Sequence, residues 1–207
     1  MRMTGLEKTM VNRPEKGAAN VRRIAAQLDR LAGWRGTDAL ELGCGIGDVA
    51  AFLAAERGLR VIGADMDAAQ IALARARHRE RPGLAFVVAD AARLEFPAAS
   101  FDLVVSQNVF HHIPQWRAAV REIGRVLRPG GHLLWLDLTP PAWLTLLLRP
   151  LRAQFGLYTL EEIRAACREE GLVEVAERQL VALRHELTWR KGRNGVTAPT
   201  GGSHYRV

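Results

Sequence analysis

The stretch that decides the fold is Ala39-Leu40-Glu41-Leu42-Gly43-Cys44-Gly45-Ile46-Gly47-Asp48. Its apolar beginning predicts a buried strand, and its glycines predict a turn that opens directly into a helix. Such a turn suits a nucleoside ligand, because glycine allows close approach and a helix N-terminus offers unpaired N–H groups. The pattern is G-x-G-x-G after Glu41, not the G-x-G-x-x-G of dinucleotide enzymes. Glu41 and Asp48 flank the turn with carboxylates, which favours an adenine nucleoside that also carries positive charge.

On both sides of this turn, strand patterns alternate with helix patterns. Expected strands lie at residues 38–42, 60–64, 84–89, 101–106 and 132–138, followed by two antiparallel closing strands at 172–178 and 181–189. Expected helices lie at residues 47–57, 67–79, 114–127 and 160–169. Strict alternation of strand and helix predicts a parallel, doubly wound sheet, in which a ligand binds beyond the carboxyl ends of the strands.

Local signals mark the ends of several elements. Asn20 is expected to cap a first helix at residues 21–31, since its side chain can accept from the first helical N–H groups. Asp67 and Thr159 are expected to cap later helices for the same reason. Residues 128–131, Arg-Pro-Gly-Gly, predict a sharp turn before the fifth strand.

The length of 207 residues fits one domain, expected at residues 1–190, with a flexible tail at 191–207. No uncharged apolar run reaches the roughly 18 residues of a spanning helix. Residues 1–16 lack the apolar core of a secretory signal. The two cysteines, Cys44 and Cys167, are too few for a disulfide framework or a zinc set, which favours a cytoplasmic location.

The formal net charge is +7, with 29 Lys and Arg residues. The arginines are spread over the expected helices, which favours solvated helix faces over a peripheral membrane surface. Nucleic acid is the least favoured partner, because only the overall basicity points to it. The histidines are scattered without the spacing of metal ligands, so no metal is expected.

Four stretches follow one another in the order and spacing of a known family. They are residues 41–47 (ELGCGIG), 61–67 (VIGADMD), 86–102 (FVVADA, then FP and SFD) and 125–131 (RVLRPGG). The chain thereby resembles the class I S-adenosylmethionine-dependent methyltransferases of the small single-domain type, over a core at residues 38–138. The resemblance implies a Rossmann-like α/β fold with a mostly parallel seven-stranded sheet, one antiparallel strand and helices on both faces. It also implies S-adenosyl-L-methionine as the cofactor.

The residue chemistry agrees with this cofactor. Asp65, about 20 residues after the glycine turn, has two oxygens that can accept both ribose hydroxyls. Asp90 is placed to accept from the adenine amino group, while the backbone N–H of Ala91 donates to the ring. Glu41 can hold the methionine ammonium, or can accept N–H groups of the nearby loop.

The expected cofactor-binding residues are Glu41, Gly43, Cys44, Gly45, Gly47, Asp65, Met66, Asp90, Ala91, Ser106 and Gln107. Ser106 and Gln107 resemble positions whose backbone carbonyl meets the methionine amino group. Cys44 is interpreted as a small turn residue rather than a nucleophile, because a turn occupied by cofactor leaves no access for substrate.

The candidate catalytic residues are His111, His112 and Asp137. A base is required only if the accepting atom carries a proton, since methyl transfer from a sulfonium depends mainly on positioning. Histidine is suited to that role near neutral pH, and we expect His111 to contact the acceptor. His112 is expected to be structural at a helix start, and Asp137 to be a catalytic group or a structural acceptor.

Residues 139–158 lie where relatives often build the lid of the acceptor pocket. A helical face there would carry Leu144, Leu147, Leu148 and Leu151. Three interpretations remain open. The segment is a lid over an apolar acceptor, a plain core helix, or an interfacial helix that touches lipid with its arginines at the headgroups.

The sequence therefore predicts a methyltransferase that acts on a small or moderately apolar acceptor through oxygen, nitrogen or carbon, and a lipophilic molecule is one candidate for that acceptor. Quinone-type precursors and phospholipid amines are the first acceptors to try. An NAD-dependent oxidoreductase is one alternative, which Glu41 and the form of the glycine turn disfavour. A non-catalytic cofactor-binding module is the other, since binding motifs alone do not establish turnover.

Overall fold

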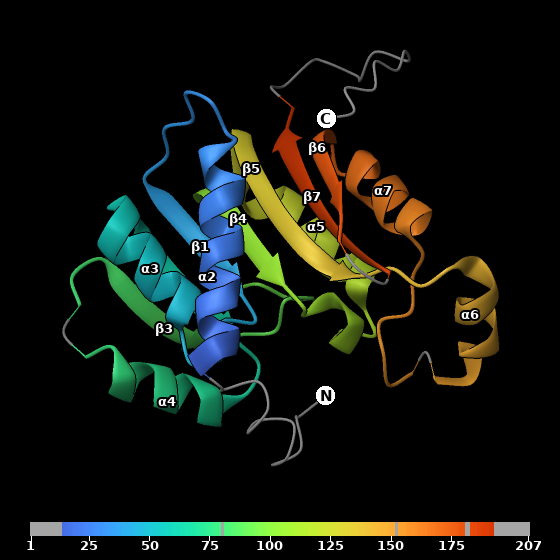
Figure 1. Cartoon of the computed structure of the whole chain (residues 1–207), viewed down its shortest axis with the longest axis horizontal. Helices are drawn as coiled ribbons and strands as arrows, with labels where there is room; N and C mark the ends of the chain where they lie inside the picture. Colours follow the sequence, from blue (N-terminus) through green and yellow to red (C-terminus); the bar gives the residue numbers. More distant parts are fainter. Residues whose placement is uncertain (1–13, 80, 152, 181–182, 193–207) are drawn as a thin grey trace.

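The computed structural model describes residues 14–79, 81–151, 153–180 and 183–192. Within them, seven strands form one sheet in the order β3-β2-β1-β4-β5-β7-β6 (Figure 1). The strands are β1 (Asp38–Leu42), β2 (Arg60–Asp65), β3 (Leu84–Val88), β4 (Phe101–Gln107), β5 (Leu127–Leu138), β6 (Leu172–Gln179) and β7 (Arg184–Lys191). The neighbours among β1 to β5 pair in parallel, and β7 runs antiparallel to both β5 and β6. The predicted Rossmann-like sheet with one antiparallel strand is confirmed.

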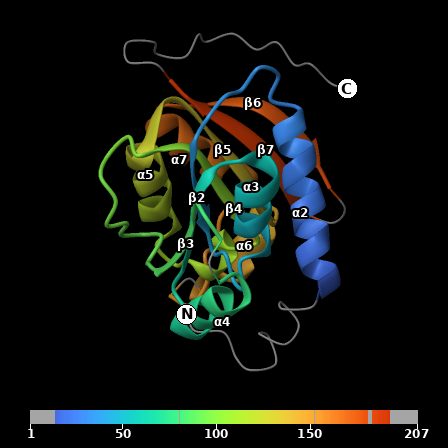
Figure 2. The same ribbon diagram turned by 90° about the vertical axis from the view of Figure 1, so that its left-hand side faces the viewer.

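Helices cover both faces of this sheet (Figure 2). One face carries α2 (Pro14–Asp29), α3 (Asp48–Arg57) and α4 (Ala68–Arg77), and the other carries α5 (Trp116–Val126) and α7 (Leu160–Glu169). The central strand β4 shows why. Its Val104 packs into the core under α5 and α7, whereas Leu103 and Val105 pack under α2 and α3, and all three are fully buried. A parallel strand covered on both faces is expected to be apolar throughout.

Several predicted boundaries are confirmed in detail. Thr159 caps α7 with a complete capping box, in which Glu162 reaches back to the Thr159 N–H at 2.8 Å. Asp67 caps α4 by accepting from the Ala69 N–H at 2.9 Å. Gly58 ends α3 in the left-handed conformation that glycine adopts at low cost.

Other boundaries were wrong. Helix α2 begins at Pro14, so Asn20 lies inside the helix and does not cap it. The predicted turn at 128–131 belongs to β5, which begins at Leu127, and the pairing of β5 with β4 shifts register there. Gly130 accommodates this irregularity with a φ of +86°.

The closing strands also differ from the prediction. Strand β7 begins at Arg184, and residues 181–182 of the predicted strand lie outside the described residues. It ends at Lys191, whose Nζ donates to the Glu170 carbonyl. Lys191 therefore belongs to the sheet rather than to the predicted tail, of which residues 193–207 are outside the description.

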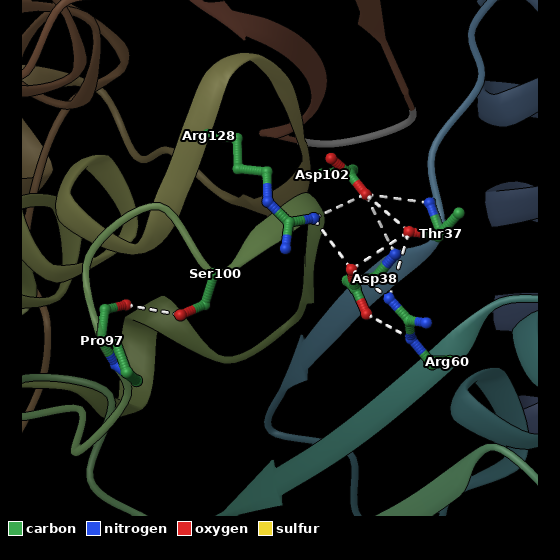
Figure 3. Close-up of polar contacts among 7 residues, drawn as sticks. All are labelled: Thr37, Asp38, Arg60, Pro97, Ser100, Asp102 and Arg128. Atoms are coloured by element: carbon green, nitrogen blue, oxygen red, sulfur yellow. Dashed lines mark hydrogen bonds and ion pairs between the residues drawn. The ribbon is translucent and has the colours of Figure 1, made fainter.

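An ion-pair network joins the amino ends of four strands (Figure 3). Arg128 Nη1 lies 2.9 Å from an oxygen of both Asp38 and Asp102, and Arg60 Nε donates to Asp38 Oδ1 at 2.7 Å. The Thr37 N–H donates to Asp102 Oδ2 at 2.9 Å. The hydrogen bond from Arg60 is the largest reason why the pKa of Asp38 is well below its usual range. This network clamps β1, β2, β4 and β5 together where they start.

The segment after β5 stands apart from the sheet. Helix α6 (Ala142–Leu147) lies at the right of Figure 1, beyond the layers, and continues into a 3₁₀ turn at Arg149–Leu151. The side chains of Trp143, Leu146 and Leu147 are 68%, 66% and 69% exposed. The plain core helix is therefore wrong, because Leu147 was expected on the buried face. No helix among the described residues is long and apolar enough to cross a bilayer.

Candidate active site

A cavity of about 640 Å³ opens at the carboxyl ends of β1, β2 and β4. Its wall comes from the glycine turn after β1, the ends of β2 and β4, the loop after β3, the first half of α2 and the start of β7. This is the edge at which a doubly wound parallel sheet binds its ligand. The cavity brings together most of the residues that the sequence singled out.

The three glycines of the turn share a positive φ but differ in how much space surrounds the position of a Cβ. All have positive φ, namely +69° at Gly43, +53° at Gly45 and +84° at Gly47. A Cβ on Gly43 would lie 2.2 Å from a methyl carbon of Val109, and one on Gly47 would lie 2.5 Å from the ring of Phe86. A Cβ on Gly45 would meet nothing within 4 Å. Gly43 and Gly45 line the cavity, whereas Gly47, which begins α3, does not.

Asp65, the last residue of β2, lines the cavity beside the glycine turn. Its Oδ2 accepts from the Gly45 N–H at 3.0 Å, and its Oδ1 accepts from the Asp67 N–H at 2.9 Å. These two bonds fix the plane of the carboxylate, which has about four acceptor sites in all. Met66 follows it with its side chain 48% exposed and also lines the cavity.

Glu41 is a buried carboxyl at the centre of the site. It is 7% exposed, and its Oε2 has no hydrogen-bond partner among the described residues. Burial raises the pKa of Glu41 to about 8, and the nearby carboxylates of Asp65 and Asp48 add to the shift. A buried carboxyl without a cationic partner is costly in its charged form, so this position suits a ligand that brings its own positive charge.

Asp90, Ala91 and Cys44 complete this part of the wall. Asp90 follows β3, and its Oδ1 accepts from the Ala92 N–H at 2.9 Å, which holds the loop in shape. Burial raises the pKa of the Cys44 thiol far above its usual range. A thiol held neutral is a poor nucleophile, which agrees with its interpretation as a turn residue.

Ser106 and Gln107 end β4 differently. Ser106 is fully buried and does not line the cavity, so only a backbone role remains open to it. Gln107 does line the cavity, and both polar atoms of its amide are buried without a partner in the described part of the chain. An unsatisfied buried amide is unusual in a folded protein and marks a position where a ligand atom can bind.

This donor set fits S-adenosyl-L-methionine. The Glu41 carboxyl, whose Oε2 has no partner among the described residues, suits the ammonium of the methionine part, and the fixed Asp65 carboxylate suits a ribose diol. The open space at Gly45 admits a ligand against the backbone. None of these positions offers a bare helix N-terminus without carboxylates, as a pyrophosphate prefers.

His111 reaches the same cavity from the 3₁₀ turn at Phe110–His112, directly after β4. Its Nδ1 lies 2.5 Å from Asp137 Oδ1. Asp137 itself is fully buried and does not line the cavity. Its Oδ2 accepts from the Val109 and Phe110 N–H groups at 2.8 and 2.7 Å, so the carboxylate holds both the turn and the imidazole. Asp137 is therefore placed as a positioning residue behind His111.

His112 also lines the cavity, with its ring centroid 4.0 Å from that of His111. Tyr158 is fully buried and does not line the cavity. Burial, assisted by the charge of Asp137, raises the pKa of the Tyr158 hydroxyl well above its usual range. Of the predicted lid at residues 139–158, no described residue lines the cavity, so the lid stays a prediction.

Sequence reasoning missed one wall of the cavity. It is formed by residues of α2 and β7, namely Glu15, Lys16, Gly17, Ala19, Asn20, Arg23 and Arg184. The spacing of Lys16, Asn20 and Arg23, four and three residues, was a signal of one helix face that could have been read. Within the described ranges, no group of three or more His, Cys, Asp or Glu residues could hold a metal ion.

Comparison with known proteins shows what this chain is similar to. Residues 40–135 match the model of the methyltransferase domain. The phthiotriol/phenolphthiotriol dimycocerosates methyltransferase of Mycobacterium leprae is 38% identical over 128 residues, which are 61% of this chain and 46% of that protein. The fatty-acid O-methyltransferase of Mycolicibacterium smegmatis is 39% identical over 113 residues, 52% of this chain and 41% of that protein.

The fold has close counterparts among solved structures. The PH0226 protein of Pyrococcus horikoshii superposes with a TM-score of 0.70 at 21% identity, covering 87% of this chain and 93% of that one. The chain spans about half the length of the curated relatives it matches. Fold, glycine turn and matched domain agree with the resemblance carried by the four sequence stretches. The chain is thus similar to the class I S-adenosylmethionine-dependent methyltransferases in fold and in the matched domain.

Proposed function

We propose that the protein transfers a methyl group from S-adenosyl-L-methionine to a hydroxyl oxygen of a small or moderately apolar acceptor. The observation that carries this proposal is the single cavity that Glu41, Asp65 and His111 share. Carboxylates suited to the cofactor and a histidine suited to deprotonate an acceptor thus meet in one space. The names of the relatives, which include a fatty-acid O-methyltransferase, support a lipophilic acceptor.

The cofactor would be held by the turn after β1 and the ends of the next two strands. Glu41 binds the ammonium, Asp65 binds the ribose, and Asp90 with Ala91 binds the adenine. The cofactor supplies an electrophilic methyl group, and its departing thioether needs no acid. The chain's own contribution is therefore orientation of the two partners and exclusion of water.

His111 would act as the base toward the acceptor. Asp137 Oδ1 accepts a hydrogen bond from the protonated Nδ1 of His111. This leaves Nε2 of His111 as the basic nitrogen that can take a hydroxyl proton. Because Asp137 is also bonded to the Val109 and Phe110 N–H groups, the imidazole orientation is fixed by the backbone that follows β4. Positioning of this kind contributes to general base catalysis, which typically gives about 10²- to 10⁴-fold in rate.

Calorimetric titration tests the cofactor assignment. We expect S-adenosylmethionine and S-adenosylhomocysteine to bind, NAD not to bind, and the Asp65→Ala variant to lose at least about tenfold in affinity, because a charge-assisted hydrogen bond contributes roughly 1.5–3 kcal/mol. Asp29→Ala, on the exposed end of α2, is the matched control and should bind normally. Binding of NAD alone would favour the oxidoreductase. Tight cofactor binding with no methylated product from any acceptor would favour a non-catalytic module.

Helix α6 would contact lipid rather than close the cavity in this conformation. It lines no part of the cavity, and it exposes Trp143, Leu146 and Leu147 next to the exposed Arg149. Apolar side chains beside a cation suit an anionic lipid surface. We expect the protein to pellet with anionic liposomes and the Trp143→Ser variant to pellet less. Equal recovery of both in the supernatant would contradict this contact. A cytoplasmic location stays a prediction.

A further inference from the structure

One wall of the cavity is basic and takes no part in the proposed cofactor contacts. Arg23 of α2 and Arg184 of β7 both line the cavity, and both are partly buried. Neither guanidinium forms an ion pair with any residue that the structure describes, although most of the other partly buried arginines do. Two partly buried cations therefore face the same space without an ion-pair partner in the described part of the chain.

The contact of α2 with β7 explains why these two arginines line the same cavity. Arg30, directly after α2, pairs with Glu186 of β7, and Gln27 Nε2 of α2 lies 3.5 Å from the Leu187 carbonyl oxygen. Gln27 and Arg23 are four residues apart, so they share one face of α2. That face runs along β7 toward the cavity.

The register of β7 puts Arg184 at the cavity end of this contact. Glu186 and Arg184 are two residues apart and so point to the same face of the sheet. Arg184 pairs with Leu138, the last residue of β5, at the carboxyl edge where the cavity opens. Along β7, Glu186 with its partner Arg30 is thus followed by Arg184, which lines the cavity together with Arg23.

Gln107 supplies an independent observation at the same place. It continues the alternation of Leu103 and Val105, which pack under α2 and α3, so its side chain lies on the face that carries α2. Its amide Nε2 and Oε1 are both buried without a hydrogen bond to a described residue. The amide lines the cavity with Arg23 and Arg184 and offers a neutral donor.

We propose that Arg23, Arg184 and Gln107 form an anion subsite, which holds a carboxylate or phosphate group of the methyl acceptor. This rests on the proposed function, since it assigns the acceptor's charge. Guanidinium groups match an oxyanion with paired N–H donors, and an amide N–H adds a third bond. Asp48 also lines the cavity but is engaged with Arg77 at 3.3 Å. The acceptor is thus an amphiphile with an anionic group that this wall recognises.

The test uses probes that differ only in charge. Octanoate, octyl phosphate and the uncharged octanamide are titrated into the full chain, with and without S-adenosylhomocysteine. We expect at least one of the two anions to bind about tenfold or more tightly than octanamide, because charge-assisted hydrogen bonds are roughly twice as strong as neutral ones. The anion that binds more tightly identifies a carboxylate or a phosphate as the ligand.

Variants locate the effect. Arg23→Gln and Arg184→Gln should each lower the affinity for the preferred anion about tenfold and leave octanamide and S-adenosylhomocysteine binding unchanged. Arg22→Gln is the matched control, because Arg22 is exposed and does not line this cavity. Thermal unfolding of each variant checks that the fold is kept.

Three results would overturn the subsite. They are equal affinity for both anions and octanamide, no binding of any probe, and the same loss of affinity in Arg22→Gln as in Arg23→Gln. Failure of S-adenosylhomocysteine to bind, with the anion preference intact, would instead contradict the proposed function and leave the subsite supported. The two claims therefore fail separately.

Discussion

The two edges of the sheet treat their charges in opposite ways. At the amino edge, Asp38 and Asp102 share the guanidinium of Arg128, and both carboxylates also accept other hydrogen bonds within the network (Figure 3). At the carboxyl edge, Glu41 Oε2 has no donor among the described residues, and Arg23 has no described acidic partner. The first edge is internally satisfied, whereas the second is complementary to something outside the chain.

The amino edge of the sheet therefore contributes mainly to stability, and the carboxyl edge mainly to ligand binding. A satisfied network lowers the free energy of the folded chain itself, while unsatisfied groups raise it until a ligand binds. Substitutions at the amino edge should therefore change unfolding and spare ligand binding. Substitutions at the carboxyl edge should mainly change ligand binding and catalysis. Four measurements test that separation.

The largest effect is expected at His111. Replacing it with Ala should lower kcat for a hydroxyl acceptor by about 10²- to 10⁴-fold, because the base toward the acceptor proton is lost. The rate of S-adenosylhomocysteine formation measures this. Asp137→Asn should lower kcat in the same direction and alter the pH profile, since the amide cannot hold the imidazole in the same way.

Controls keep this prediction specific to the acceptor side. S-adenosylhomocysteine affinity should be unchanged in His111→Ala, because His111 is not among the proposed cofactor contacts. A carboxylate acceptor, which carries no proton at neutral pH, should be much less sensitive to the substitution. Unchanged turnover of a hydroxyl acceptor in His111→Ala would remove the base from the mechanism.

A smaller effect is expected at the amino edge. Asp102→Asn should lower the free energy of unfolding by roughly 1–3 kcal/mol, because Arg128 and the Thr37 N–H lose a charged acceptor. Urea denaturation measures the loss, and calorimetry should find the cofactor affinity unchanged. If cofactor affinity fell in proportion to stability, the two edges would not be independent.

The smallest effect concerns the pH dependence of Glu41. Its pKa is raised to about 8, so in the ligand-free protein it is protonated at neutral pH and must lose that proton to bind an ammonium. Cofactor affinity should rise several-fold between about pH 6.5 and 7.5, with proton release on binding at pH 7. It should level off above pH 8, because the ligand's own amino group, with a pKa of about 8, then loses its positive charge. Glu41→Gln should bind more weakly and without this dependence.

The same group sets a stability trend with a definite sign. Its folded-state pKa lies above the ordinary carboxyl value of 4.5, so the folded protein holds more protons than the unfolded one between these values. The free energy of unfolding should therefore fall as the pH rises from 4.5 through 8. Thermal scans of the ligand-free protein should show this decline, and Glu41→Gln should flatten it.

What the sequence could predict was the part of the site that is local along the chain. The glycine turn, Asp65 and Asp90 each follow a strand directly, so placing the strand also places the residue. The fold class followed from alternation of elements in the same way. The pairing of His111 with Asp137 needed more, because it depends on β4 and β5 being neighbours with a particular register.

The α2 wall of the cavity, the role of Arg184 and the start of β5 could not be predicted, because the local sequence pattern does not show them. Helix α2 carries polar side chains such as Lys16, Asn20 and Arg23 on the face toward the cavity, so no apolar periodicity marks its first half. Arg184 is the first residue of β7, and its proposed role depends on its position beside α2, about 160 residues earlier in the chain. The sequence of residues 128–131 is typical of a turn, but β5 continues through them, and Gly130 adopts a positive φ there.

The contact of α2 with β7 has a consequence for how the protein acquires activity. Gln27 and Leu187 are 160 positions apart, so this contact closes a very long loop and forms late in folding. The cofactor wall, built between residues 41 and 91, needs only neighbouring strands. A chain still emerging from the ribosome can thus assemble its nucleoside pocket before its acceptor wall, and specificity for the acceptor is the last property the molecule gains.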